Sequence, residues 1–218
     1  MKNLFKYGGI LLGIALLLSL AFSPELFAVS GTSIAALGIF ARVCGKNVSG
    51  TQAIFIAEKA SVTAITVTSD EISAITGTTP FVRVDADQDK MNWEQEDAKV
   101  GANNMKYSNL VEFALSKLSK AMNIWSKALA DASPCGLYSI VTDGNGQNWL
   151  VGYDATSLTT RPLRYDNGKA KTGKLISEED GNTKVFQLKN ECMGLCIPFD
   201  STLNTAINNG SSTIIKWS

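Results

Sequence analysis

The chain has 218 residues, with twenty basic and twenty acidic side chains and therefore no formal net charge. This length is enough for one domain, or for one domain with an appendage. The balance of charge lacks the basic excess typical of proteins that bind the phosphate backbone of nucleic acid. The chain has no histidine, so the commonest general base and metal ligand is missing.

Residues 1–42 predict a membrane anchor. Lys2 and Lys6 precede a long apolar run, in which Glu25 is the only charged residue between Gly8 and Ala41. This run is longer than the roughly 20 residues that cross the core of a bilayer.

We interpret the apolar run as a single transmembrane helix, kinked at Pro24. A cleaved signal peptide is one alternative, but Leu26-Phe27-Ala28 fits the small-x-small cleavage pattern poorly. A pair of short apolar helices, Tyr7–Phe22 and Leu26–Ala41, is the other.

Residues 43–218 predict a separate, mainly β domain. Its boundary is a loop rich in glycine and small polar residues, which spans residues 44–51. Short runs rich in apolar and β-branched residues follow at close spacing and predict strands: Gln52–Ala57, Val62–Thr68, Ile72–Ile75 and Phe81–Val84. Short strands separated by turn signals favour a sandwich or barrel.

An acidic stretch follows these strands. Asp85, Asp87 and Asp89 alternate, and Glu96 falls at the twelfth position of a calcium-binding loop. The sixth position is Lys90, however, where such a loop needs glycine. We therefore interpret the stretch as a solvated connection, with a calcium site or an acid/base pair as the weaker alternatives.

The segment from Asn109 to Ala132 predicts one amphipathic helix, because its apolar residues recur every three or four positions. Asn109 can cap the first turn, with Glu112 three residues later. Ser133-Pro134 ends the helix, since the residue before proline avoids the α region. We expect this helix to pack on the domain's own sheet; a membrane-active or partner-binding helix is the alternative.

A β-hairpin is predicted next, with Leu137–Thr142 and Gln147–Tyr153 as its strands. The four residues 143–146, Asp-Gly-Asn-Gly, tolerate the positive φ angles of a tight turn. The alternation places Trp149, Val151 and Tyr153 on one face and Leu150 on the other, so both faces are expected to be partly covered.

The C-terminal part predicts further short elements. They are an extended run at Arg161–Tyr165, a loop at Gly168–Gly173, a hairpin of Lys174–Ser177 with Thr183–Asn190, a buried strand or turn at Cys192–Phe199, a helix at Ser201–Asn209 and an edge strand at Thr213–Trp217.

The four cysteines are Cys44, Cys135, Cys192 and Cys196. Only Cys192 and Cys196 are close in sequence, and three residues separate them instead of the two of a usual zinc knuckle. We interpret the cysteines as reduced, mostly buried thiols, with a four-cysteine zinc site as the alternative. No catalytic, cofactor-binding or metal-binding residue is predicted, and no cofactor.

Five pieces of the sequence together resemble the tail tube (major tail) proteins of phages that infect Bacteroidetes. They are Ala128–Leu137, Asp143–Gly146, Trp149–Tyr153, Arg161–Arg164 and Thr172–Asn182. The loop at residues 44–51 and the strands at Val62–Ile75 look like the start of that family, so the resemblance covers most of residues 44–200.

The resemblance implies a β-sandwich or barrel with one flanking helix. It also implies rings, usually hexameric, that form through extended sheets and hairpins and stack into a tube through which the genome passes. The segment from Asn109 to Tyr153 is then expected to help form a subunit interface. Tail tube proteins are expected to be soluble, and the apolar segment at residues 1–42 departs from that pattern.

The leading hypothesis is therefore a phage virion structural protein, in which a membrane-anchored, tail-tube-like domain assembles into a ring or conduit for genome delivery. Its partners are copies of itself, other virion proteins and a lipid membrane, with nucleic acid at most passing through. The alternative is a vertex, penton or spike-associated membrane protein of a membrane-containing phage, used for capsid assembly or host attachment. A membrane-anchored hydrolase is disfavoured, because the chain lacks Gly-x-Ser-x-Gly and a phosphate-binding glycine loop.

Overall fold

The structure is a computed structural model of the chain. It describes residues 49–86, 90–100, 104–116, 118–154, 159–171 and 182–216, which belong to one compact unit, Lys46–Ser218. The anchor predicted at residues 1–42 lies outside the described residues. Within the described ranges, no helix is long and apolar enough to cross a membrane.

The described part is mainly β, as predicted. Its strands are β1 (Thr51–Glu58), β2 (Val62–Thr68), β3 (Glu71–Gly77), β4 (Phe81–Arg83), β5 (Met91–Val100), β6 (Asn104–Ser116), β7 (Leu137–Asp143), β8 (Asn148–Val151), β9 (Tyr153–Asp154), β10 (Thr159–Thr160), β11 (Arg164–Lys171), β12 (Thr183–Cys192), β13 (Ile197–Pro198) and β14 (Ile215–Lys216). Its α-helices are α2 (Lys120–Ala132) and α3 (Ser201–Asn208), and two short 3-10 turns are η3 (Lys59–Ser61) and η5 (Ser133–Cys135). The four strands predicted between Gln52 and Val84 correspond to β1–β4.

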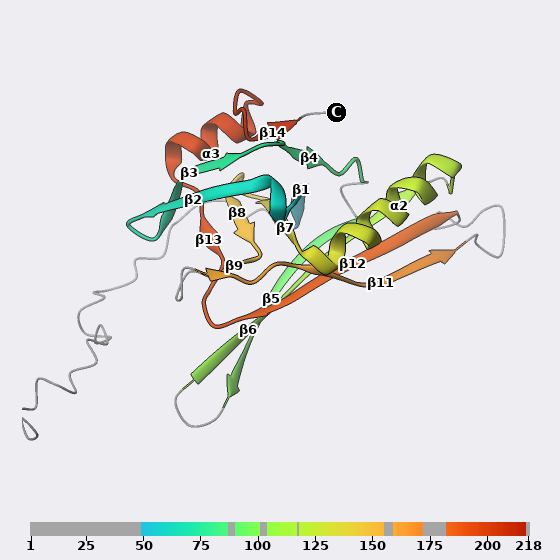
Figure 1. Cartoon of the computed structure of the whole chain (residues 1–218), viewed down its shortest axis with the longest axis horizontal. Coiled ribbons are helices and arrows are strands. Elements are labelled where there is room, and N and C mark those ends of the chain that lie inside the picture. The colour runs from blue at the N-terminus through green and yellow to red at the C-terminus, as the bar shows by residue number, and fades with distance from the viewer. Residues whose placement is uncertain are drawn as a thin grey trace, which may run out of the picture. The chain divides into compact units, whose positions relative to one another are not determined.

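The strands of the described residues form two sheets and two small strand pairs (Figure 1). The six-stranded sheet has the order β13-β8-β7-β1-β4-β14, and the four-stranded sheet has the order β11-β12-β6-β5. β2 pairs with β3, and β9 pairs with β10.

The six-stranded sheet lies in the middle of the domain, with apolar side chains packed on both faces. In β1, Ile54 belongs to the core shared with the four-stranded sheet and α2, whereas Phe55 belongs to the core shared with β3 and α3. Both residues are almost fully buried. A strand covered on both sides needs a nearly continuous apolar run, which explains the sequence Ala-Ile-Phe-Ile-Ala in β1.

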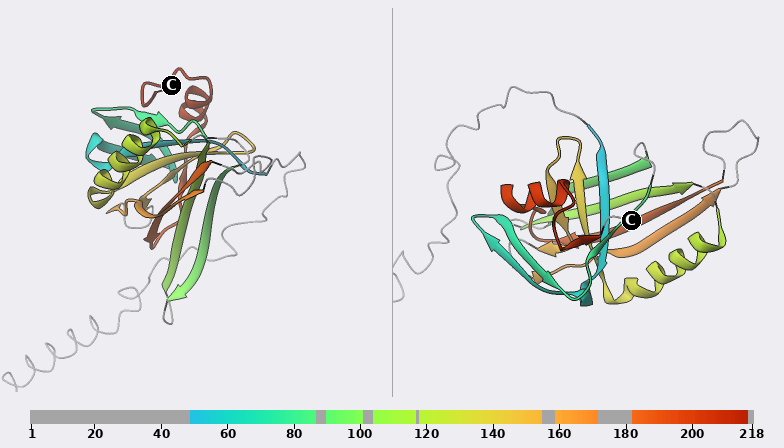
Figure 2. Two further views of the ribbon diagram at one scale, coloured as in Figure 1. Left: turned by 90° about the vertical axis from the view of Figure 1, so that its right-hand side faces the viewer. Right: turned by 90° about the horizontal axis from the view of Figure 1, so that it is seen from above.

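The four-stranded sheet contains a long hairpin of β5 and β6. Its strands pair without interruption from Met91 opposite Phe113 to Val100 opposite Asn104. The end of this hairpin protrudes from the rest of the domain (Figure 2, left). At the other end of the sheet, Trp125 of α2 packs edge-on against Phe113 and Phe186, with ring centroids 6.0 and 5.3 Å apart.

The helix predicted from Asn109 begins only at Lys120, because Asn109–Ser116 form the second half of β6. Asn109, Val111 and Phe113 alternate as buried residues, and strands flank β6 on both sides. The true N-cap is Ser119, whose hydroxyl accepts the N–H of Met122 at 3.1 Å. The predicted end of the helix before Pro134 is confirmed.

The hairpin predicted after the helix is confirmed as β7 and β8, with both faces covered. The Asp143 carboxylate accepts the N–H groups of Asn145 and Gln147 and so closes the turn. The prediction that Tyr153 lies on the same face as Trp149 and Val151 is wrong. Gly152, with φ +110°, interrupts the alternation, and Tyr153 packs against the core that contains Leu150.

The C-terminal elements agree with the sequence in part. The helix predicted at Ser201–Asn209 is α3, and the predicted edge strand contains β14, which pairs in parallel with β4 at the sheet edge. The loop predicted from Gly168 is wrong as far as Lys171, because these residues pair with β12 and continue β11. The strand predicted at Lys174–Ser177 lies outside the described residues.

Candidate assembly interface

The acidic residues of the calcium alternative do not form one loop in the described part of the chain. Asp85 is exposed after β4, and Glu96 is exposed within β5. Asp87 and Asp89 lie outside the described residues. Among the residues that the structure describes, no group of three or more histidine, cysteine, aspartate or glutamate side chains could hold a metal ion.

Two of the cysteines lie in the core, as predicted. Cys192 and Cys196 are buried free thiols, whereas the free thiol of Cys135 is exposed. Cys44 lies outside the described residues. Burial raises the pKa of the thiols of Cys192 and Cys196, which keeps them neutral and suits a packing role.

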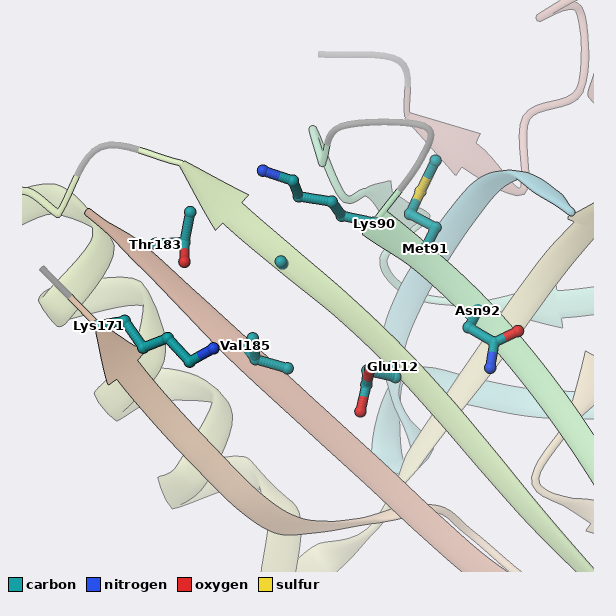
Figure 3. A pocket seen from close by; sticks show the side chains of 8 residues that line it. Lys90, Met91, Asn92, Glu112, Lys171, Thr183 and Val185 are labelled. Carbon is teal, nitrogen blue, oxygen red and sulfur yellow. The ribbon is translucent and has the colours of Figure 1, made fainter. Parts of the chain in front are cut away.

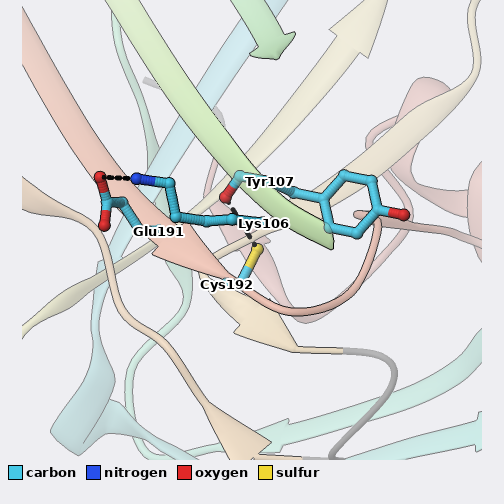
Figure 4. A network of polar contacts seen from close by, with 4 residues as sticks. All are labelled: Lys106, Tyr107, Glu191 and Cys192. Carbon is cyan, nitrogen blue, oxygen red and sulfur yellow. Dashed lines mark hydrogen bonds and ion pairs between the residues drawn. The ribbon is translucent and has the colours of Figure 1, made fainter. Parts of the chain in front are cut away.

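The two thiols meet at the amide of Asn109. The Cys196 Sγ donates to Asn109 Oδ1 at 3.1 Å, while Asn109 Nδ2 donates to Asn190 Oδ1 at 3.0 Å and to Cys192 Sγ at 3.5 Å. Figure 4 shows Cys192 below Tyr107, whose carbonyl oxygen it approaches, and beside the ion pair of Lys106 and Glu191. The cluster joins the base of the long hairpin to β12.

The four-stranded sheet ends in two strands that have a partner on one side only. Within the described ranges, β5 pairs with β6 alone and β11 pairs with β12 alone. An edge strand presents a row of backbone donors and acceptors to a further strand. At the start of β11 the Tyr165 N–H already donates to Ser133 Oγ at 2.6 Å, so β5 and the rest of β11 are the places where this sheet can be extended.

The two edge strands carry opposite charge. β5 contains Glu94, Glu96 and Asp97 with one lysine, which gives a net charge of −2 (one minus three). β11 contains Arg164, Lys169 and Lys171 with one aspartate, which gives +2 (three minus one). These six residues are all exposed.

Charged residues of the two edge strands also lie in the same cross-strand row of the sheet. Glu94 is opposite Leu110, Leu110 is opposite Lys189, and Lys189 is opposite Arg164. One row across the sheet therefore begins with an acidic residue at one edge and ends with a basic residue at the other.

Within the described part of the chain, one face of the four-stranded sheet carries no helix. Because Phe113 and Phe186 point toward α2, alternate residues on each strand point to the opposite side. This helix-free face includes Glu94, Glu96, Lys106, Glu112, Lys189 and Glu191. Lys106 and Glu191 form an ion pair across it at 2.8 Å, and Gln187 donates to Glu112.

A shallow pocket of about 260 Å³ lies on the sheet at the end nearer to α2. Figure 3 shows Lys171 of β11, Val185 of β12 and Glu112 of β6 along it. Its lining contains the two basic residues Lys90 and Lys171 and the acidic residue Glu112. The pocket is part of a polar surface rather than an enclosed ligand site.

A larger and more apolar groove lies beside α2. It has a volume of about 580 Å³ and runs between α2 and the strands β1 and β4. Ala128 and Leu129 of α2 and Val82 of β4 form its walls, and Glu58 and Lys216 lie at its rim. Sequence patterns do not reveal this groove, because it forms between segments far apart in the chain.

The stretch from Asn109 to Tyr153, which is expected to help form a subunit interface, contains one strand that is not accessible to a second subunit. Residues 137–142 of β7 are all buried in the middle of the six-stranded sheet. A strand that is covered inside its own subunit cannot contact another one. The exposed candidates are instead the charged edges and the protruding hairpin.

Comparison with known proteins gives no further assignment. No protein-family model matches the sequence, and no curated protein matches it either.

Proposed function

We propose that this protein is a phage virion structural protein whose β domain assembles with copies of itself into a ring or conduit for genome delivery. The observation that carries the proposal is the pair of exposed sheet edges with opposite charge, β5 at −2 and β11 at +2. A chain with two different, mutually attractive edges is suited to repeated head-to-tail contact.

The strand directions fit such a contact. Each neighbouring pair in the order β11-β12-β6-β5 is antiparallel, so β5 and β11 run in opposite directions. A β11 strand from a second copy in the same orientation would therefore continue the antiparallel ladder beside β5. A head-to-tail contact closes into a ring when the rotation between neighbouring copies is a whole fraction of a full turn. With any other rotation the copies continue as an open helix.

Protection against aggregation is the other common reason for charge on an edge strand. That role is best served when both edge strands carry a net charge of the same sign, because like charges keep copies apart. Here the two edges attract each other, which favours pairing. Each exposed ion pair contributes only about 0–1 kcal/mol, so backbone hydrogen bonds would hold the contact and the charges would choose its partner and register.

The helix-free face is suited to line the opening of such a ring. It is polar and carries both signs of charge, among them Glu112, Lys106 and Lys189. A passing nucleic acid would meet no continuous basic surface to hold its phosphates. α2 would then lie on the outer side of the ring.

The finer fold we propose is a tail-tube-like β-sandwich with α2 as the flanking helix. A β-sandwich or barrel with one flanking helix is what the sequence resemblance implies, and the position of α2 against the four-stranded sheet supports it. We also propose that residues 1–42 anchor the chain in a membrane, which places the protein in a membrane-associated position of the virion. No enzymatic role is proposed.

Electron microscopy of the full-length chain, purified in a mild detergent, tests the ring. We expect closed rings with a central opening. A homogeneous monomer at micromolar concentration would contradict the proposal.

The second candidate is a vertex, penton or spike-associated membrane protein, favoured by the apolar sequence at residues 1–42. Labelling the protein with antibody on intact particles separates the two positions. Label along a tail supports the tube, and label at the capsid vertices supports the second candidate.

A further inference from the structure

The free stretch of β11 lies at one end of the sheet. Because the Tyr165 N–H is already bonded to a side chain of its own subunit, the stretch open to a further strand is residues 167–171. The last of these, Lys171, is level with Ser116 of β6, whereas β5 reaches only to the level of Phe113. A second copy placed at the same level would leave the end of β11 without a partner, so neighbouring copies must be offset along the strands.

The faces of the sheet limit the possible offsets. Lys169 follows the residue opposite Phe186, which points toward α2, so Lys169 and Lys171 lie on the helix-free face. Directly opposed residues share a face. In a sheet continued through a second copy, these lysines therefore lie opposite Glu94, Glu96 or another residue on the helix-free side of β5.

We propose that β11 of one copy pairs with β5 of the next copy in the register that places Lys171 opposite Glu94 and Lys169 opposite Glu96. This inference rests on the proposed function and adds to it the alignment of the contact between subunits. The paired stretches lie entirely within the described residues of β5 and β11, and all four charged side chains are exposed.

The four charged side chains are available for these contacts. Within the described ranges, none of them takes part in an ion pair, whereas Lys106 pairs with Glu191 and Lys189 pairs with Asp166. Opposite charges placed directly across a strand pair stabilise it, and like charges destabilise it. Two new pairs of opposite charge therefore favour this register.

The remaining charges of the two strands do not oppose this register. Asp97 comes opposite Gly168, which has no side chain, and Lys99 comes level with the bulge at Asp166. Two further charged residues fall outside the paired stretch: Lys90 and Arg164.

The neighbouring registers offer fewer favourable contacts. Because the faces must match, the next possible registers differ by two residues. A shift in one direction leaves only the pair of Lys169 with Glu94, and a shift in the other direction leaves only the pair of Lys171 with Glu96. The proposed register is therefore the one that joins the most opposite charges on the helix-free face.

The same register gives the strands an inclination that suits a closed ring. Glu94 is level with Leu110 of β6, and Lys171 is level with Ser116. Pairing Glu94 with Lys171 offsets neighbouring copies by six residues (116 minus 110), which is about 20 Å at about 3.3 Å per residue. Four strands about 4.8 Å apart are about 19 Å wide, so the strands incline by about 45° to the ring axis. Closed sheets have strand inclinations of about 35–45°.

Disulfide crosslinking of the assembled full-length protein tests the register. Two variants carry cysteines at positions that the register places opposite each other, Glu94→Cys/Lys171→Cys and Glu96→Cys/Lys169→Cys. Two matched controls exchange the partners, Glu94→Cys/Lys169→Cys and Glu96→Cys/Lys171→Cys. Every variant loses one acidic and one basic residue, so the edges keep the same net charge in all four.

The variants are oxidised mildly after assembly and compared on a non-reducing gel. Each also carries Cys44→Ser and Cys135→Ser, which remove competing thiols. Within one copy, β6 and β12 separate β5 from β11, so a crosslink joins two copies.

The register predicts which variants crosslink. Directly opposed cysteines have Cα atoms about 4.5–5.5 Å apart, within the reach of a disulfide. The exchanged positions are diagonal neighbours, about 7–8 Å apart and outside that reach. We expect the matched pairs to give at least about tenfold more covalent dimer and higher oligomer than the exchanged pairs.

The outcomes separate the register from the proposed function. If an exchanged pair crosslinks as well as the matched pairs, the register is wrong and the contact between the edges stands. If electron microscopy shows rings but none of the four variants crosslinks, the rings use other surfaces and the inference is wrong. If the unmodified chain forms no rings, the proposed function fails together with the inference.

Discussion

Asn109 joins β6 to β12 and to the turn after β12 at a single buried amide. Its side chain contacts Asn190, Cys192 and Cys196, and it is 2% exposed. A buried polar group that loses its partner costs more than the hydrogen bond itself contributes, because the partner stays desolvated. The amide therefore fixes the base of the long hairpin against β12.

We expect Asn109→Ala to lower the free energy of unfolding by about 1–3 kcal/mol. Urea unfolding of the full-length chain, followed by tryptophan fluorescence, measures the change. Asn92→Ala, at an exposed position of β5, is the control and should change stability by less than about 0.5 kcal/mol. Equal effects of the two substitutions would show that the buried amide has no special role.

Tyr138 makes the domain sensitive to alkaline pH. Burial, with a smaller contribution from Tyr153, raises the pKa of Tyr138 from 10.0 to about 12. Because the folded state holds the proton more tightly, its stabilising contribution is present below pH 10 and is lost as the pH rises toward 12.

We therefore expect Tyr138→Phe to remove part of the stability loss of the domain between pH 10 and 12. The difference between the two chains should be on the order of 2 kcal/mol at the upper end. Urea unfolding at several pH values measures it. Parallel curves for both chains over this range would contradict the burial of an ionisable Tyr138.

At the scale of elements, Ser119 determines where α2 begins. Its hydroxyl caps Met122, whereas Asn109, the cap expected from the sequence, lies in the middle of β6. Ser119→Ala is expected to cost about 1 kcal/mol, and Ser119→Asp, which keeps an acceptor, should cost little. Thermal unfolding of the two variants gives the comparison, and equal losses would argue against a cap at this position.

The elements that could be predicted are those with a local signal. The strands β1–β4 follow apolar runs, and the β7–β8 hairpin follows its Asp-Gly-Asn-Gly turn. The β6–α2 boundary could not be found, because Leu110, Phe113 and Ala114 satisfy helical spacing while Asn109, Val111 and Phe113 satisfy strand spacing. The pairing of β6 with β5 and β12 decides between them, and no local pattern contains that pairing.

The candidate interface was hidden from the sequence for the same reason. Glu94 and Arg164 are seventy residues apart and belong to different strands, yet the pairings place them at the two ends of one row. Their charges are visible in the sequence, but which strands form the sheet edges is not. The groove at Ala128 and Val82 likewise depends on the packing of α2 over β1 and β4.

At the scale of the whole molecule, we expect assembly to depend on salt. The charges on β5 and β11 are exposed, so added salt screens them over the Debye length, about 10 Å at 0.1 M. Raising the salt concentration should slow ring formation more than it loosens formed rings, because steering by charge acts mainly on the association rate. Light scattering at low and at high salt measures the rate at which rings form and the rate at which formed rings dissociate. An association rate independent of salt would argue against charged edges as the contact.

Charge exchange between the two edges tests the central claim most directly. Sedimentation velocity in detergent compares the unmodified chain, Glu94→Lys/Glu96→Lys, Arg164→Glu/Lys169→Glu, and the chain with all four changes. Each double variant places like charges on both edges and should remain monomeric, while the fourfold variant restores opposite charges and should assemble again. Assembly of both double variants, or a monomeric fourfold variant that is folded, would contradict pairing between β5 and β11.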